Sequence, residues 1–223
     1  MALFKALDAL AEMRRKNLEV NLLTINSVLT VCKKAAGTDQ MEEAVNAAFD
    51  IFEDMKSMKL PPDLVTFNLL LETCSNAIEC GYAECFDKAS SVFDKMQEYQ
   101  IKPNVASYNM LLFSCSRAAR DSGPMIISKC FHILDLMEED GLLPDTSVFN
   151  AMIDACAKSA TGNDGVSVGL QILERMSANR IEPDVITYNS LINVCAMSAA
   201  DGDTNAFANA QEILYMMLKN GVR

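Results

Sequence analysis

The sequence repeats itself about every forty residues, and this periodicity limits the possible folds more than any other feature. Five segments that open with Asp or Asn and close with Asn are versions of one another: 21–26, 63–68, 104–109, 145–150 and 184–189. Their closing asparagines are 42, 41, 41 and 39 residues apart. Repeats of this length are typical of chains in which one small unit stacks on copies of itself.

Two further residue types keep the same register. A cysteine stands six residues after each closing asparagine, and a methionine stands eight residues before each opening residue: Cys32, Cys74, Cys115, Cys156 and Cys195; Met13, Met55, Met96, Met137 and Met176. Small residues and Leu or Phe precede each methionine at helical spacing, so each repeat is expected to hold two helices with one apolar face apiece. The periodic cysteines are expected to be buried apolar side chains in a reducing compartment, not disulfides.

The helix boundaries follow from the junction between repeats, where a proline ends one helix and Asp or Asn caps the next. The expected fold is an all-α solenoid of about five stacked helix-turn-helix repeats in a single domain, 1–223. It comprises the second helix of a partial repeat (1–21), then repeats 22–63, 64–104, 105–145, 146–184 and 185–223. The last stops about two residues early, so further repeats are expected to flank the chain. Glycines mark the turn within each repeat: Gly37, Gly81, Gly123, Gly162 and Gly202.

Composition argues against several classes of function. The net charge is −11, no run of residues is long and apolar enough for membrane insertion, and His132 is the single histidine. Without a Cys-x-x-Cys pair or an evident catalytic partner for His132, the sequence predicts no catalytic site, no metal site and no cofactor. We therefore do not expect an enzyme.

The Pro-Asp/Asn junction, followed five residues later by Asn, resembles the pentatricopeptide-repeat family, as do Thr-Tyr-Asn at 187–189 and Cys-Ala-Lys at 156–158. The resemblance covers essentially the whole chain and implies a right-handed solenoid. The tetratricopeptide repeat has a similar helical hairpin but lacks this junction. Repeats of the family are typically shorter than the 39–42 residues found here. The excess lies between the periodic Cys and Met, and we expect surfaces specific to this protein at 81–86, 121–124 and 160–165.

The resemblance also implies that the chain binds single-stranded RNA, one base per repeat, in the RNA metabolism of a mitochondrion or plastid. The implied base-reading residues are the closing asparagines and the last residue of each repeat: Asn26, Asp63, Asn68, Asn104, Asn109, Asp145, Asn150, Asp184 and Asn189. A pair of Asn with Asp looks like a uridine reader, and Asn with Asn like a cytidine reader that tolerates uridine, which gives U, C or U, U, U. Residues placed to pack beside the bases are Leu23, Val65, Ala106, Ser147 and Ile186.

Charge leaves a second function open. The candidates for phosphate contacts are Lys33, Lys34, Arg117 and Lys158; with Glu72 and Asp154 they give the first helices, counted over about fifteen residues from each start, a summed charge of +2. The acidic excess is thus expected on the second helices and loops, and little electrostatic attraction for RNA remains. The alternative is a protein-interaction scaffold or a peripheral subunit of a large assembly, which would bind its partner through the concave face or the extended loops. In that case the repeated Asp and Asn residues would be ordinary helix caps.

Overall fold

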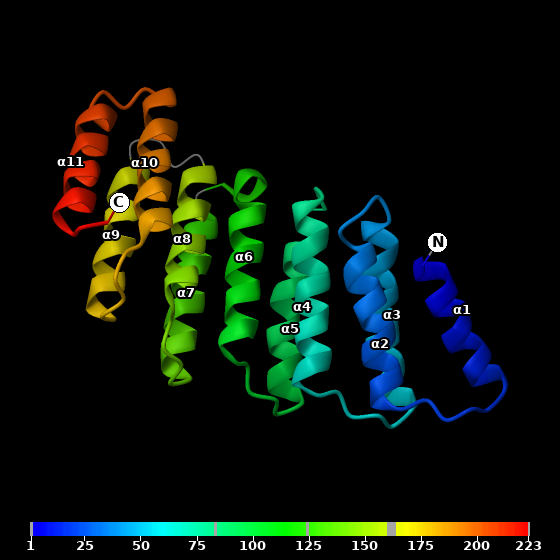
Figure 1. Ribbon diagram of the computed structural model, residues 1–223. Helices are drawn as coiled ribbons and strands as arrows, with labels where there is room; N and C mark the ends of the chain where they lie inside the picture. Colours follow the sequence, from blue (N-terminus) through cyan, green and yellow to red (C-terminus); the bar gives the residue numbers. More distant parts are fainter. Residues whose placement is uncertain (1, 83, 124, 160–163, 223) are drawn as a thin grey trace. The chain divides into compact units, whose positions relative to one another are not determined.

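The computed structural model describes residues 2–82, 84–123, 125–159 and 164–222, and its regular structure within these ranges is entirely α-helical (Figure 1). The predicted all-α repeat fold is confirmed. The helices are α1 (Ala2–Arg15), α2 (Leu22–Ala35), α3 (Met41–Ser57), α4 (Leu64–Glu79), α5 (Cys85–Glu98), α6 (Val105–Ser122), α7 (Met125–Glu139), α8 (Thr146–Lys158), α9 (Asp164–Ala178), α10 (Val185–Ala200) and α11 (Ala206–Lys219).

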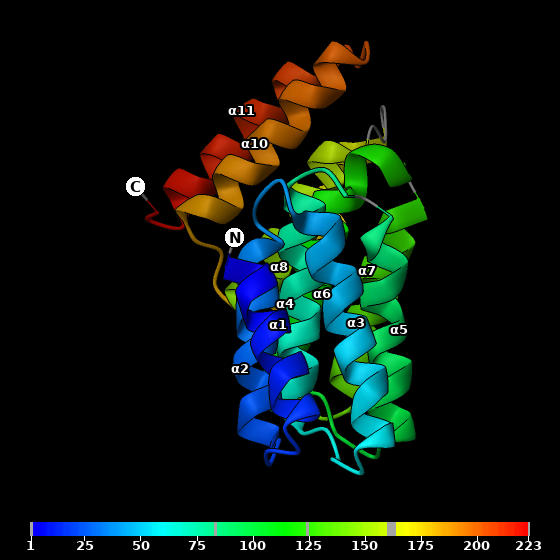
Figure 2. The ribbon, with the colours of Figure 1, turned by 90° about the vertical axis from the view of Figure 1, so that its right-hand side faces the viewer.

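The chain forms two compact units, residues 1–114 and 115–223. In the first unit α2 packs against α1, α3 and α4, and α4 also packs against α3 and α5. In the second, α8 contacts α7, α9 and α10, and α10 contacts α9 and α11. Figure 2 shows the layers within the first unit, with α2 on one side and α3 and α5 on the other. Each unit is therefore a stack of helical hairpins.

Every first helix begins directly after the Asp or Asn expected to cap it. The side chain of Asn21 accepts a hydrogen bond from the Thr24 amide at 3.0 Å at the start of α2. The carboxylates of Asp63 and Asp184 accept from the amides three residues ahead at 2.8 Å. Because a cap of this kind satisfies one of the free amides of the first turn, it stabilises its helix by about 1 kcal/mol.

The second helices end in a recurring backbone motif that the sequence analysis did not predict. Four residues after each of the five periodic methionines, and after Met217 at the equivalent position of α11, stands a residue with φ between 52° and 74°: Asn17, Lys59, Gln100, Gly141, Arg180 and Gly221. The residue that follows then donates its amide to the methionine carbonyl, as Ile101 does to Met96 at 2.8 Å. This is a Schellman motif, which turns the chain out of one helix and toward the proline of the next junction.

The turns within the repeats agree in part with the glycine prediction. Gly81, Gly123 and Gly202 have positive φ values of 104°, 61° and 97°, which favour glycine. Gly37 does not adopt this conformation. Gly162 lies outside the described residues, as do residues 83, 124 and 160–163 of the segments expected to carry the extra length.

The periodic apolar residues form the core, as predicted. All five periodic cysteines are at most 1% exposed, and so are Met55, Met96, Met137 and Met176. The cysteines are free thiols, and burial raises the pKa of Cys32 to about 11, which keeps it protonated and unreactive at neutral pH. Large rings fill the space between neighbouring hairpins; the centroids of Phe52 and Phe67 lie 5.4 Å apart, and Tyr99 lies 6.0 Å from both.

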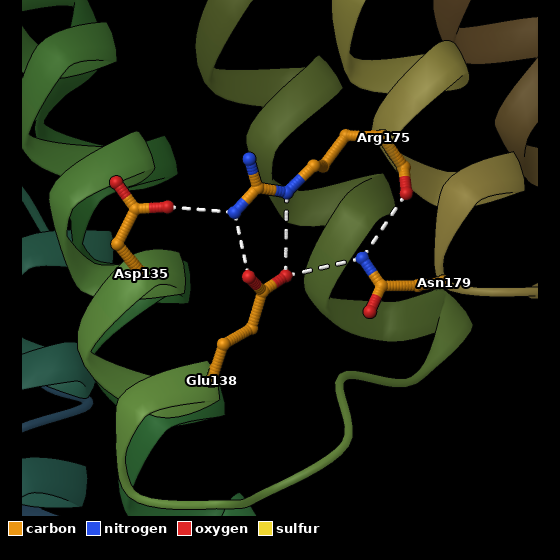
Figure 3. Close-up of polar contacts among 4 residues, drawn as sticks. All are labelled: Asp135, Glu138, Arg175 and Asn179. Atoms are coloured by element: carbon orange, nitrogen blue, oxygen red, sulfur yellow. Dashed lines mark hydrogen bonds and ion pairs between the residues drawn. The ribbon is translucent and has the colours of Figure 1, made fainter.

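Acidic residues of the second helices join neighbouring repeats. In Figure 3, Arg175 of α9 reaches Asp135 of α7 at 2.7 Å and Glu138 at 2.6 Å, and Asn179 donates to Glu138 at 3.1 Å. Burial raises the pKa of Glu138, but the hydrogen bonds from Arg175 and Asn179 outweigh it and leave that pKa below its ordinary value. In the first unit Lys95 of α5 pairs with Glu53 of α3 at 2.5 Å. Part of the acidic excess is therefore used to hold the stack together.

Among the described residues, no helix is long and apolar enough to cross a membrane. Nor do three or more His, Cys, Asp or Glu side chains gather there in a way that would hold a metal ion. His132 is exposed on α7.

The Schellman motif makes a test of backbone strain possible. Replacing Gly141 by Gln should destabilise the protein by about 0.5–1 kcal/mol, because a side chain in the left-handed region costs about 1–2 kcal/mol, offset in part by the lower entropy of the unfolded chain. The reverse change, Gln100→Gly, should stabilise it by a similar amount. Urea denaturation measures both. The control is Gly37→Gln, where φ is not left-handed; an equal loss there would contradict the explanation.

Candidate nucleic-acid interface

The junction between α2 and α4 brings together two of the predicted base-reading residues. Asn26 of α2 donates its Nδ2 to the Oδ1 atom of Asp63, the cap of α4, at 3.3 Å. The hydroxyl of Thr66, in the first turn of α4, donates to the Oδ1 atom of Asn26 at 2.9 Å. An amide, a capping side chain and a hydroxyl thus form one cluster across two repeats. We call such a set a junction cluster.

The second unit contains the same arrangement between α8 and α10. Asn150 donates to the Asp184 carboxylate at 3.3 Å, and the Thr187 hydroxyl donates to Asn150 at 2.7 Å. These distances match those of the first cluster within 0.2 Å, although the two clusters lie in different units. The geometry therefore follows from the repeat itself.

A variant of the cluster joins α4 and α6, where the cap is Asn104 instead of an aspartate. The Ser107 hydroxyl donates to the Oδ1 atom of Asn68 at 2.7 Å and lies 3.0 Å from the Oδ1 atom of Asn104. Here the hydroxyl makes the contact to the closing asparagine, while the cap contributes a neutral amide. The difference between Asp and Asn at the last position of the repeat is thus accommodated without loss of the cap, since the Ser107 amide still bonds Asn104 at 3.0 Å.

The remaining predicted base-reading residues are Asn109, Asp145 and Asn189. Asn109 belongs to the first unit and Asp145 to the second, so their pairing stays a prediction from the sequence. Asp145 caps α8, where its carboxylate accepts from the Val148 amide at 3.1 Å. Asn189 is exposed on α10.

Burial places each cluster at the margin of the core. The hydroxyl-bearing residues Thr66, Ser107 and Thr187 are 0% exposed. The asparagines that they contact are half-buried, so their amides lie neither in the apolar interior nor freely in solvent. An amide in this position is held by the protein and still has surface left for a ligand, which suits a side chain that reads a base.

The capping carboxylates are kept ionised by the clusters. Burial raises the pKa of Asp63, but the hydrogen bonds with Thr66 and Asn26 lower it more, so the pKa lies below its ordinary value of 3.8. The pKa of Asp184 is lowered by the same balance, with Thr187 and Asn150 as the donors. At neutral pH both carboxylates are therefore ionised, and they can accept hydrogen bonds but not donate them.

Next to the clusters, apolar side chains stand in solvent. Leu23, Val65 and Ile186 occupy the second residue of their helices and are 75%, 53% and 61% exposed. Ala106 is also exposed at this position, whereas Ser147 is half-buried and bonds the Asp145 carboxylate. Exposed aliphatic groups recurring at one position are not explained by packing, and they offer a surface on which a flat base can rest.

The predicted phosphate contacts are partly neutralised by carboxylates of the first helices. Lys33 pairs with Glu72 of the neighbouring helix α4 at 3.0 Å. Lys158 pairs with Asp154 at 2.5 Å, and Asp154 also accepts a hydrogen bond from Ser116. Lys34 is exposed and Arg117 half-buried. The net charge of the first helices was evident from the sequence, but these pairings were not predicted.

Sequence reasoning also missed the three hydroxyls of the junction clusters. Their signal is a Thr or Ser three residues after a cap, the position at which a side chain can bond back to the cap in a capping box. Asp63 and Asp184 form such boxes with Thr66 and Thr187. The pattern was visible, but only the stacking of the helices shows that the hydroxyl also contacts the preceding repeat.

Comparison with known sequences gives a family match. The pattern described as the pentacotripeptide-repeat region of PRORP matches residues 2–122 and again 76–183. No curated protein matches the chain at a significant level.

Several solved structures share the fold. Maize PPR10 is 22% identical with a TM-score of 0.68, over 99% of this chain and 27% of that one; PPR10 has also been solved in complex with an 18-nt psaJ RNA element. The PPR domain of Arabidopsis thaliana protein-only RNase P 1 (PRORP1), in complex with tRNA, is 14% identical with a TM-score of 0.65, over 91% of both chains. Nuclear proteinaceous RNase P 2 (PRORP2) of the same plant is 19% identical with a TM-score of 0.67, over 89% of this chain and 38% of that one. The chain thus spans about a quarter of the PPR10 chain, and at these identities the likeness concerns the fold.

The low pKa of Asp63 predicts how its cap responds to acid. Because the pKa is lower in the folded protein, the stabilisation that ionised Asp63 contributes is fully present above its ordinary value of 3.8 and is lost as the pH falls through the folded pKa. Asp63→Asn should therefore be less stable than the parent at about pH 7, and the difference should shrink below pH 3.8. Denaturant unfolding at a series of pH values measures this. A difference that stays constant on acidification would show that the charge of Asp63 plays no part in the cap.

Proposed function

We propose, from the premise that this chain belongs to the pentatricopeptide-repeat family, that it is a non-catalytic module that binds single-stranded RNA with one base at each junction cluster. The observation that carries the proposal is the repeated pair of a half-buried asparagine and a capping Asp or Asn, held in the same geometry in both units. Two of the predicted pairs are in direct contact, Asn26–Asp63 and Asn150–Asp184, and Asn68 and Asn104 are joined through the Ser107 hydroxyl.

The groups at each cluster suit recognition of a base edge. An amide can donate and accept, whereas an ionised carboxylate only accepts, so a change from Asp to Asn alters what a base meets. The exposed side chains of Leu23, Val65 and Ile186 lie on the first turns of the same helices and supply an apolar contact for the base plane. By position in the family, the proposed target is pyrimidine-rich: U, C or U, U, U.

The relatives widen the range of RNA to be tested. The PPR domain of PRORP1 was crystallised with tRNA, and PPR10 with a short RNA element. We propose the single strand as the ligand because the clusters present groups for unpaired base edges. A role in the RNA metabolism of a mitochondrion or plastid is likewise a proposal, since the similar PRORP2 is described as nuclear.

A second candidate function is protein binding, and the observation that favours it is charge. The chain carries a net charge of −11, and the cations Lys33 and Lys158 are already paired with carboxylates. A basic partner protein would be attracted to such a molecule, whereas RNA would gain little from phosphate contacts.

The deciding experiment is a binding titration at physiological salt with three RNAs: a U-rich strand, an A-rich strand of equal length and a folded tRNA. We expect the U-rich strand to bind more tightly than the A-rich strand. Equal binding to both strands would contradict base reading, preferential binding of tRNA would replace the single strand with a folded target, and absence of binding to all three would favour the protein-binding role.

Exchange of Asp and Asn at the caps tests the assignment of bases to repeats. Asn104→Asp makes the second pair like the others and should shift its preference from C toward U by about two- to tenfold, the value of one hydrogen bond. Asp184→Asn should shift the fourth base from U toward C by a similar factor. Since Asn also caps helices, as Asn104 does in this chain, neither variant should lose its fold.

Titration against strands that differ at one base measures both shifts. Each variant is the control for the other, because a change at one junction should leave the preference at the other junction unaltered. A shift at both bases in either variant, or at neither, would contradict the assignment.

The pairing of Lys33 with Glu72 predicts an effect of charge on affinity. In Glu72→Gln the ammonium of Lys33 is released from its ion pair, so RNA affinity should rise about two- to fivefold, and log K should fall more steeply with log salt, by about 0.7 for one added contact. The matched control is Glu53→Gln, which changes the net charge equally but acts on the pair with Lys95 in the second-helix layer. Equal gains in both variants would attribute the effect to net charge alone.

A further inference from the structure

The hydroxyl in each junction cluster bonds the cap and the asparagine at the same time. In the cluster of α2 and α4, the Thr66 oxygen accepts the backbone amide of Asp63 at 3.3 Å. The corresponding distances are 3.2 Å from the Asn104 amide to Ser107 and 3.1 Å from the Asp184 amide to Thr187. Each hydroxyl oxygen thus accepts a hydrogen bond from the backbone amide of the cap, and the hydroxyl has one hydrogen of its own to donate.

Two oxygens compete for that hydrogen, and the contacts favour the asparagine. The Oδ1 atom of Asp63 lies 2.8 Å from the Thr66 hydroxyl, but it already accepts from the Thr66 amide and from the Asn26 side chain. The Oδ1 atom of Asn26 lies 2.9 Å from the same hydroxyl. In the cluster with the neutral cap, Ser107 lies 2.7 Å from Asn68 and 3.0 Å from Asn104, so the asparagine is the nearer acceptor.

The consequence is a fixed orientation of the asparagine amide. The oxygen and nitrogen of an amide occupy nearly the same volume, so packing alone does not decide which of them faces a ligand. A donor on one side and a carboxylate acceptor on the other hold the amide of Asn26 in one orientation, and that of Asn150 in the same one. One lone pair and one hydrogen of each amide remain for a base.

We infer that Thr66, Ser107 and Thr187 are positioning residues that set base preference by orienting the asparagine of the preceding repeat. The inference rests on the proposed RNA-binding function and adds to it a residue that does not touch the base. The three residues are 0% exposed, so they act through the asparagine and not by direct contact with RNA.

The chain itself shows that the helix start does not need this hydroxyl. Val148 occupies the corresponding position of α8, and its amide still donates to the capping carboxylate of Asp145 at 3.1 Å. Valine has nearly the shape of threonine and lacks the hydroxyl. Thr66→Val is therefore expected to fold with α4 capped and to lose the contact that orients Asn26.

The matched control lies in the same helix. Thr73 is also 0% exposed, and its hydroxyl donates to the Leu69 carbonyl within α4 at 2.7 Å. Thr73→Val removes a buried hydroxyl of the same residue type without touching a junction cluster. Any general effect of losing a buried hydroxyl should appear equally in both variants.

The experiment compares the ratio of the dissociation constants for U-rich and A-rich strands in the parent chain and in its variants. Thr66→Val and Thr187→Val should each lower the discrimination by about two- to tenfold, mainly through weaker binding of the U-rich strand. Thr66→Ser should keep the discrimination of the parent chain, because serine retains the hydroxyl and Ser107 makes the same contact in the native chain. Thr73→Val should leave the ratio unchanged.

The outcomes separate this inference from the proposed function. A parent chain that discriminates between the strands, with the same ratio in Thr66→Val, would overturn the positioning role and leave RNA recognition intact. A parent chain without base preference would overturn both. If Thr66→Val does not fold, Ser107→Ala tests the same contact with a smaller change, at the junction where the cap is neutral.

Discussion

The structure depends on capping side chains that serve two helices, as at the junctions of α2 with α4 and of α8 with α10. Asp63 caps the first turn of α4 and at the same time accepts a hydrogen bond from Asn26 of the preceding repeat. A helix that began one residue earlier or later would move this carboxylate away from both partners. The start of each first helix and the stacking of neighbouring repeats are therefore set together, although the separation along the sequence is 37 residues for Asn26 and Asp63 and 34 for Asn150 and Asp184.

If the clusters read bases as proposed, stability and recognition share the same groups without conflict, because capping tolerates a substitution that recognition would detect. Asn104 replaces an aspartate and still caps α6 through its oxygen. What changes is the charge beside the neighbouring asparagine and the presence of a second donor. The residue that ends a repeat of this chain can thus be Asp or Asn while the cap is kept. Asn26 is held by the next repeat, so formation of its junction cluster requires that repeat to be folded and in place.

The sequence predicted features that depend on spacing along one chain segment. The positions of Asn21 and Asp184 gave the helix starts, and the periodicity of Cys74 and Met96 gave the core. It did not predict the left-handed residues Lys59, Gln100 and Arg180, because only the equivalent Asn17, Gly141 and Gly221 carry a residue preference for that backbone. The pair of Lys33 with Glu72 was also missed, since it depends on how α2 and α4 are rotated against each other, which periodicity does not fix.

The distribution of charge bears on what kind of binding this scaffold can support. Acidic residues of the second helices are partly neutralised by pairs such as Arg175 with Glu138, and the carboxylates Glu72 and Asp154 reduce the positive charge of the first helices. If the chain binds RNA as proposed, phosphate attraction contributes little, and the free energy of binding comes mainly from base contacts. A binder of this type gains little from a strand with the wrong bases. Its affinity would be modest, its salt dependence shallow and its discrimination large relative to its affinity, because non-specific binding is largely electrostatic.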